Sequence, residues 1–396
     1  MRKILILLTI LTLTISVHSQ TQNGLKEDLE YFAQNLPQKH INLFAKISKT
    51  EFESKISRVE SQLNSLDKEA FLNELFKLLV AVGDEHTRVE PETMGSGNVP
   101  VQFSIFTEGV FITAIDSAHT ELLLSKVMKV NGEPINKVID ELKTIIQPDN
   151  PSYFNTMMLY YLGNAPILKG MGISNSAEEV IYTLERESGE IIDISFKSGG
   201  SSKLVMAKQF PKADMYSNSY WYKYDAVNQS IYFNYLNCRN DGQLPFENFA
   251  LELFKSIETN KPEKIIVDLR FNGGGSSYVL QPFLKKIKES YLNKKGSFYV
   301  LIGQGTFSSA LMNAVDLKRD FNTILVGAPT AGSINHYGET LVFRLPNTNA
   351  SVIYSIKYFE TWKGKEGALY PDVKVKYSVE NFKNGTDEAL EYIHKQ

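Results

Sequence analysis

The second half of the chain alternates strand-like and helix-like runs, and this alternation limits the possible folds more than any other feature. The strand-like runs are rich in apolar and β-branched residues and cover residues 230–238, 264–271, 297–303 and 322–329. Amphipathic, helix-like runs lie between them at 246–259, 278–289 and 309–318. Strands that alternate with helices need crossover connections. The sequence therefore predicts an α/β fold with a mostly parallel sheet that is covered by helices.

Two regions with other patterns precede this core. Residues 20–95 have helical spacing, with Asp67 as a predicted N-cap before an apolar stripe. The stripe consists of Phe71, Leu72, Leu75, Leu78 and Leu79. Residues 96–207 contain short β-branched and aromatic runs, and Asn131-Gly132 predicts a tight turn between a strand and an amphipathic helix. This strand–turn–helix segment resembles part of a PDZ domain. We therefore expect a helical domain at 20–95, a β-rich, PDZ-like domain at 96–207 and an α/β core at 208–396.

The first 19 residues have the features of a secretory signal peptide. Arg2 and Lys3 precede an apolar run at 4–15, and cleavage is expected after Ser19. The run is shorter than the roughly 20 residues of a membrane-spanning helix. We therefore expect a periplasmic or secreted protein with no stable membrane anchor; a retained anchor is the alternative. Cys238 is the only cysteine, so no internal disulfide can form, and it is expected to be a small buried residue.

Three of the predicted core strands end in unusual residues, at the edge where open α/β sheets bind ligands. One is followed by glycines at 273–275, whose backbone can approach a ligand closely. Another leads to Ser308 and Ser309 at the start of a helix, which suits either a helix cap or an activated nucleophile. The third ends in a loop that carries His336 and Glu339.

Together these segments resemble the tail-specific (carboxyl-terminal processing) protease family. Four of them occur in the family's order: VDLRFNGGG at 267–275, GTFSSA at 305–310, VGAPTAG at 326–332 and YPDVKV at 370–375. An earlier segment, VGDEHTRVE at 82–90, is similar to the Asp-x-His-Thr stretch of the branch that resembles the tricorn protease core. The resemblance covers residues 219–375 well and the helical front end moderately.

This resemblance implies a ClpP/crotonase-like core and a serine-type endopeptidase that hydrolyses peptide bonds by acyl transfer. It places the nucleophile at Ser308. It places the oxyanion hole at the backbone of Gly273 and Gly274 and at the N–H of Ser309. Such donors stabilise the negative charge that develops on an attacked carbonyl. The implied substrate is a protein or peptide, and no cofactor is implied.

The chain departs from the family at the catalytic base. Ser333 stands where the processing proteases carry a lysine, so a Ser-Lys dyad is excluded at that position. The tricorn-like branch uses a histidine, and His86 matches its position. Glu366 or Asp84 would orient His86, and His336 is the alternative base.

Loss of the lysine leaves a second class of function open. Some relatives of the family keep the fold without proteolysis, so the alternative is a catalytically inactive protein that binds a peptide or a lipophile. The net charge of −3, with scattered basic residues, does not favour nucleic acid. The six histidines lack metal-ligand spacing, so no metal is expected, and no particular oligomer is predicted. Asp268 and Arg270 are interpreted as a buried ion pair that shapes the glycine loop.

Overall fold

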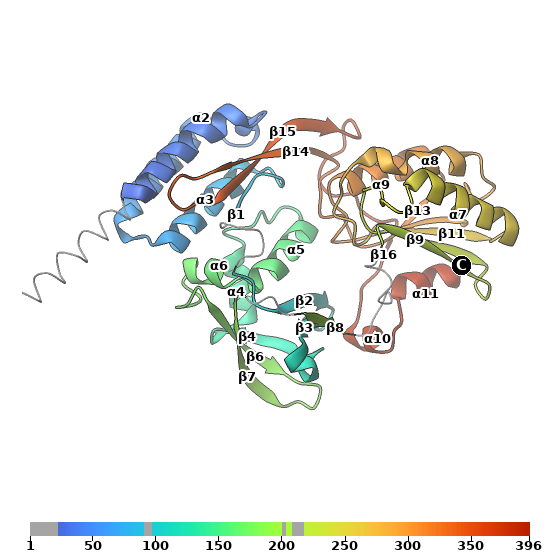
Figure 1. The fold of residues 1–396 in the computed structure, drawn as a ribbon, viewed down its shortest axis with the longest axis horizontal. Coiled ribbons are helices and arrows are strands. Elements are labelled where there is room, and N and C mark those ends of the chain that lie inside the picture. The colour runs from blue at the N-terminus through green and yellow to red at the C-terminus, as the bar shows by residue number, and fades with distance from the viewer. Residues whose placement is uncertain (1–22, 91–96, 200–202, 208–217) are drawn as a thin grey trace, which may run out of the picture.

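The computed structural model describes residues 23–90, 97–199, 203–207 and 218–396 (Figure 1). The predicted signal peptide at 1–19 lies outside these residues. Across the described ranges, no helix combines the length and the apolar character that a membrane crossing requires.

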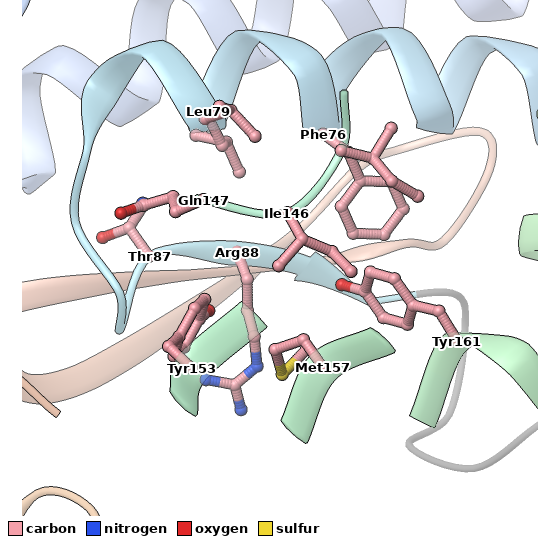
Figure 2. A pocket seen from close by; sticks show the side chains of 11 residues that line it. Phe76, Leu79, Thr87, Arg88, Ile146, Gln147, Tyr153, Met157 and Tyr161 are labelled. Carbon is pink, nitrogen blue, oxygen red and sulfur yellow. The ribbon is translucent and has the colours of Figure 1, made fainter. Parts of the chain in front are cut away.

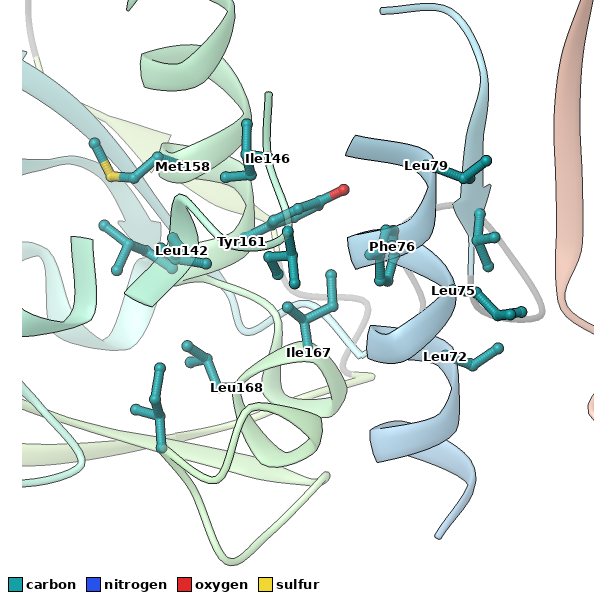
Figure 3. Packing of buried hydrophobic residues seen from close by; sticks show 14 of the residues in the cluster. Leu72, Leu75, Phe76, Leu79, Leu142, Ile146, Met158, Tyr161, Ile167 and Leu168 are labelled. Atoms are coloured by element: carbon teal, nitrogen blue, oxygen red, sulfur yellow. The ribbon is translucent and has the colours of Figure 1, made fainter. Parts of the chain in front are cut away.

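The front end of the chain is helical. Residues 23–39 form a helix, followed by α2 (Lys49–Gln62) and α3 (Lys68–Val82). Asp67 accepts a hydrogen bond from the backbone N–H of Ala70 at 2.9 Å, which confirms the predicted N-cap of α3. The whole predicted stripe on α3 is buried. In Figure 3, Phe76 points toward Tyr161, and their ring centroids lie 5.7 Å apart.

The β-rich region is built on an antiparallel sheet with helices packed against it. Its strands are β2 (Val101–Phe106), β3 (Gly109–Asp116), β4 (Lys126–Val130), β5 (Glu133–Pro134), β6 (Glu179–Glu185), β7 (Ile191–Lys197) and β8 (Leu204–Met206). Its helices are α4 (Ile135–Leu142), α5 (Pro151–Leu162) and α6 (Ala165–Gly170). The strands lie in the order β2-β3-β4-β6-β7, with β5 on β4 and β8 on β3. Asn131 and Gly132 have φ of 50° and 85°, so the predicted tight turn between a strand and a helix is confirmed.

The core sheet is mostly parallel, as predicted. Its strands are β9 (Tyr220–Asp225), β10 (Ser230–Tyr235), β11 (Lys264–Asp268), β12 (Phe298–Ile302), β13 (Ile324–Gly327) and β16 (Val373–Lys374). They lie in the order β16-β13-β12-β11-β10-β9, and only β9 runs antiparallel to its neighbour. The connecting and terminal helices are α7 (Phe246–Asn260), α8 (Gln281–Lys288), α9 (Ser309–Asp320), α10 (Val379–Lys383) and α11 (Glu388–His394).

Helices cover both faces of this sheet. Successive side chains of a strand point to opposite faces, so neighbouring residues of β11 show what packs on each face. Ile265 and Val267 of β11 pack in one cluster with α7, α8 and α9. Ile266 packs on the other face with Ala389 and Ile393 of α11. The α/β class predicted from the alternating pattern is therefore confirmed.

A long hairpin leaves the core and returns to the front of the chain. β14 (Asn335–Arg344) pairs with β15 (Ser351–Glu360), and β15 pairs in turn with β1 (Arg88–Glu90). Figure 1 shows this hairpin beside the front helices α2 and α3, which are far from it in sequence. Because residues 84–87 directly precede β1, the pairing brings them to the core.

Arg270 ties the carboxyl-terminal segment to the sheet. Its guanidinium bonds Asp268 at 2.6 Å and Asp387 at 2.9 Å, and all three side chains are buried. Arg270 also donates to the hydroxyl of Tyr377 at 3.1 Å. The interpretation of Asp268 and Arg270 as a buried ion pair is confirmed, and Asp387 is a partner that the sequence did not indicate.

We predict that Arg270→Ala lowers the free energy of unfolding by about 3–5 kcal/mol, because it leaves two buried carboxylates without their partner. Denaturant unfolding followed by circular dichroism measures the change. The matched control is Arg186→Ala, which removes the exposed ion pair with Glu190 and should change stability by less than about 1 kcal/mol. Equal effects of the two substitutions would contradict the prediction.

Candidate active site

Ser308 occupies a strained turn between β12 and α9. Its φ of 52° and ψ of −127° are unusual for a residue with a side chain, and such strain costs on the order of 1–3 kcal/mol. Ser308 is at the N-cap position of α9, yet its side chain makes no capping hydrogen bond. The prediction that Ser308 acts as a helix cap is therefore wrong for its side chain. Ser308 is half-buried. A serine on a strained strand-to-helix turn is the arrangement in which α/β-hydrolases present their nucleophile.

The turn is fixed from three sides. The hydroxyl of Thr306 donates to the carbonyl of Leu269 at 2.7 Å, which joins the turn to the end of β11. The N–H of Phe307 donates to the carbonyl of Asn272 at 3.1 Å. On the opposite side, the N–H of Ala331 donates to the carbonyl of Thr306 at 3.0 Å. The three loops at the carboxyl ends of β11, β12 and β13 therefore meet at the turn of Ser308, at the edge of the sheet where the sequence placed them.

The glycine loop packs against Ser308 without room for a side chain. A Cβ on Gly274 would lie 2.8 Å from Cβ of Ser308 and 3.1 Å from the nitrogen of Ser309. On its other side the loop is held by Cys238, whose N–H donates to the carbonyl of Gly274 at 3.0 Å. Cys238 is a buried free thiol, as expected, and burial raises its pKa to about 11. Its role here is to hold the loop.

The three predicted oxyanion donors differ in availability. The N–H of Gly274 already donates to Oδ1 of Asn272 at 2.9 Å. Within the part of the chain that the structure describes, no hydrogen bond occupies the N–H of Gly273, which is exposed, or that of Ser309, at the first position of α9. Gly273 and Ser309 are the two amides free to meet a developing oxyanion.

His86 lies between the rings of Phe307, the residue before Ser308, and His336. It stacks on Phe307 with centroids 4.4 Å apart and on His336 at 5.2 Å. Only 6% of its surface is exposed, and neither ring nitrogen has a hydrogen-bond partner within the described ranges. Burial, with a smaller contribution from His336, lowers the pKa of His86 to about 3. The ring is therefore neutral across the physiological pH range.

His336, the alternative base, has one nitrogen engaged. Its Nδ1 lies 2.9 Å from the carbonyl oxygen of Ser333, so Nδ1 must carry the proton of the neutral ring. Burial lowers the pKa of His336 as well. The structure thus brings both candidate histidines together beside the turn of Ser308.

Asp84 has a different role from the one considered in the sequence. Its donors are His40 Nε2 at 3.0 Å, Thr87 Oγ1 at 2.5 Å, Ser355 Oγ at 2.6 Å and the N–H of His86 at 2.9 Å. It is 4% exposed, and these bonds outweigh burial and hold its pKa at about 2. With both oxygens occupied, Asp84 holds the backbone of His86 and not its ring. His40 and Ser355 are far away in sequence, which did not indicate them.

Glu366 is not joined to His86 in this structure. It is exposed, on the loop after β15, and both nitrogens of His86 are without a partner. The loop is nevertheless tied to the site, because the N–H of Ile334 donates to the carbonyl of Gly367 at 2.7 Å. Glu366 as the orienting carboxylate stays a prediction.

Glu85 is a site residue that the sequence reasoning missed. Its carboxylate accepts from the N–H and the hydroxyl of Ser333, at 3.0 and 2.9 Å. Burial raises its pKa, against the lowering effect of these bonds. Its only signal in the sequence was its place next to His86.

A small cavity lies near residues 84–87, between α3, β1 and α5 (Figure 2). Its volume is about 20 Å³, enough for one water molecule and far too small for a peptide. In Figure 2 the side chain of Arg88 extends between Tyr153 and Met157. The cavity is thus a packing gap near the site and not the place of a substrate.

Comparison with known proteins places the fold. No family model and no curated protein matches the chain. The solved structure of mature CPAF aligns with 95% of this chain and 96% of its own length, with a TM-score of 0.64 and 13% identity. CPAF complexed with lactacystin covers 95% and 98%, with a TM-score of 0.66 and 13% identity. The photosystem II D1 C-terminal processing protease covers 90% and 93% at 13% identity, but its TM-score is only 0.42. The two CPAF structures therefore show that this chain shares their overall fold.

The two glycines beside Ser308 give a matched pair of substitutions. We predict that Gly274→Ala displaces the Ser308 turn, because its φ is +108° and the new Cβ would clash. Stability should fall by about 1–3 kcal/mol. Gly273→Ala meets open space and should fold normally. Thermal unfolding of both variants measures the difference, and equal midpoints would contradict the packing described here.

The buried, neutral state of His86 predicts a loss of stability in acid. Its pKa is about 3 in the folded protein, against a usual 6.5. Between these values the unfolded chain binds a proton that the folded chain does not, so the unfolding free energy falls as the pH drops through this window. Asp84 adds a further loss between its usual pKa of 3.8 and about 2.

Denaturant unfolding at a series of pH values tests this dependence. The variant His86→Leu should show a flatter slope between pH 6.5 and 4 than the wild type, since the buried imidazole of His86 is gone. A slope unchanged by the substitution would contradict the inferred state of His86.

Proposed function

We propose that this chain is an exported serine peptidase that hydrolyses peptide bonds by acyl transfer through Ser308. The observation that carries the proposal is Ser308 itself, which is strained at the start of α9 and unused as a cap. It directly follows Phe307, on which the buried, neutral ring of His86 stacks. The fold shared with CPAF and the resemblance to tail-specific proteases support it. The substrate class is a protein or peptide.

The proposed reaction begins with attack by Oγ of Ser308 on the peptide carbonyl. His86, with unprotonated nitrogen available, takes the hydroxyl proton as general base and returns it to the leaving amine. The amides of Gly273 and Ser309 receive the oxyanion, and each such donor typically contributes about 3–4 kcal/mol to stabilising the transition state. Water then attacks the carbonyl of the acyl group on Ser308. His86 takes the proton of the water and returns it to Oγ of Ser308 as the acid product leaves.

The charged form of His86 needs support in this mechanism, because burial disfavours an imidazolium. We propose Glu366 for this role. It lies on a loop that is bonded to the segment carrying His336, and its exposed position leaves it free to approach when substrate covers the site. Of the candidate carboxylates, Asp84 is already saturated by four donors.

Export remains part of the proposal. Residues 1–19 have the signal-peptide pattern, with cleavage after Ser19, which indicates a periplasmic or secreted enzyme. The single cysteine is buried and free, so the fold needs no disulfide in an oxidising compartment. Mass spectrometry of the protein from its host would give the mature amino terminus.

A catalytically inactive peptide- or lipophile-binding protein is the second candidate function. The observation that favours it is that the ring of His86 makes no hydrogen bond in the described ranges and has a pKa of about 3, far below that of an efficient base near pH 7. The occupied N–H of Gly274 also removes one predicted oxyanion donor.

Labelling with a fluorophosphonate probe separates the two functions. Folded wild-type protein should be labelled at Ser308, and Ser308→Ala should abolish labelling. His86→Ala should lower the rate by a factor on the order of 10³ or more, as loss of a catalytic base does. Ser61→Ala, on the exposed face of α2, is the control and should label normally. Absence of labelling in folded wild-type protein would favour the binding protein.

A further inference from the structure

At the position where processing proteases carry a lysine, this chain has Ser333, which is hydrogen-bonded to Glu85. Ser333 replaces the lysine, and both of its donors go to one carboxylate. Its hydroxyl donates to Oε1 of Glu85 at 2.9 Å, and its N–H donates to Oε2 at 3.0 Å. The side chain at 333 thus points toward the segment of His86 and Glu85. The neighbouring Gly332 is the residue that contacts the Ser308 backbone, with its ideal Cβ 3.5 Å from the nitrogen of Ser308.

A third residue locks this pair to the β-rich region. Asn150 accepts at Oδ1 from the first N–H groups of α5 and donates through Nδ2 to the carbonyl of Ala331 at 2.7 Å. The same Nδ2 lies 3.5 Å from Oε1 of Glu85. Glu85, Ser333 and Asn150 therefore join three segments that lie far apart in the sequence.

The cluster reaches the histidines through a carbonyl group. The carbonyl oxygen of Ser333 accepts from Nδ1 of His336 at 2.9 Å. That bond sets the tautomer of His336 and the plane of its ring, and the ring lies 5.2 Å from His86 at an angle of 12°. Glu85 fixes Ser333 at its N–H and hydroxyl, Ser333 fixes His336, and His336 supports one face of His86.

We propose that Glu85 is a positioning residue of the active site, which acts through Ser333 to hold the stacked His86–His336 pair in place of a lysine base. The inference rests on the proposed peptidase function. It also explains why a lysine placed at 333 would not restore a Ser-Lys dyad: its ammonium would enter the space beside Glu85 and pair with that carboxylate.

The test measures the fluorophosphonate labelling kinetics of the purified protein, with the inactivation rate separated from probe binding. Glu85→Gln places an amide NH₂ against the donors of Ser333, so the inactivation rate should fall about 10- to 100-fold while probe binding changes little. Ser333→Ala should slow inactivation as well, and Ser333→Thr, which keeps the hydroxyl, should restore it. Ser333→Lys should label no faster than Ser333→Ala. Glu74→Gln, which removes a carboxylate from the surface of α3, is the matched control and should behave as wild type.

A second readout does not depend on activity. Two-bond nitrogen–proton correlation spectra of protein labelled at its histidines report the tautomer of each ring. His336 should show the Nδ1-protonated form in the wild type and in Ser333→Thr, and should lose that single form in Glu85→Gln.

Each outcome decides the matter. Wild-type rates and an unchanged His336 tautomer in Glu85→Gln would overturn the positioning role while leaving the peptidase proposal intact. Faster labelling in Ser333→Lys than in the wild type would overturn it as well. No labelling of folded wild-type protein would defeat the peptidase proposal, and this inference with it. If Glu85→Gln does not fold, the Ser333→Ala and Ser333→Thr pair decides, because each changes only one side chain on the loop.

Discussion

The contact between Gly274 and Ser308 is the constraint on which the site depends. Two turns, at the ends of neighbouring parallel strands, approach so closely that a Cβ on Gly274 would lie 2.8 Å from that of Ser308. Beside this approach Ser308 has a strained conformation, and its side chain does not cap α9. The parallel sheet places the two strand ends side by side, and the close packing of their turns fixes the position of Ser308.

The buried charged groups Arg270 and Asp84 are fully hydrogen-bonded, whereas the ring of His86 is one of several buried polar groups in the described residues that have no partner. Arg270 has two carboxylates and a tyrosine hydroxyl, and Asp84 has four donors. His86 differs, because its two ring nitrogens are buried without partners within the described ranges. An unmet buried polar group costs about 1–3 kcal/mol. Such a local violation is typical of functional sites, where structure is set by the reaction and not by stability.

The fold and the function rest on different observations. A TM-score of 0.64 to CPAF at 13% identity shows a common architecture, and one architecture can host several functions. The peptidase proposal therefore depends on Ser308, His86 and the free amides. The Ser333–Glu85 pair distinguishes this site from a lysine-dependent one. It ties the loop after β13 to the segment that precedes β1.

The sequence by itself determined the features that follow from local periodicity and turn chemistry. These are the parallel α/β sheet, the buried stripe and Asp67 cap of α3, the Asn131-Gly132 turn and the presence of three unusual loops at one edge of the sheet. Only the tertiary structure decided which strands pair and which polar side chains bond to each other. The pairing of β1 with β15, the saturation of Asp84 by His40 and Ser355, and the facing of Glu85 with Ser333 join residues far apart along the chain. Short-range patterns specify which face of an element is buried, but which side chains then meet is fixed by the packing of whole elements.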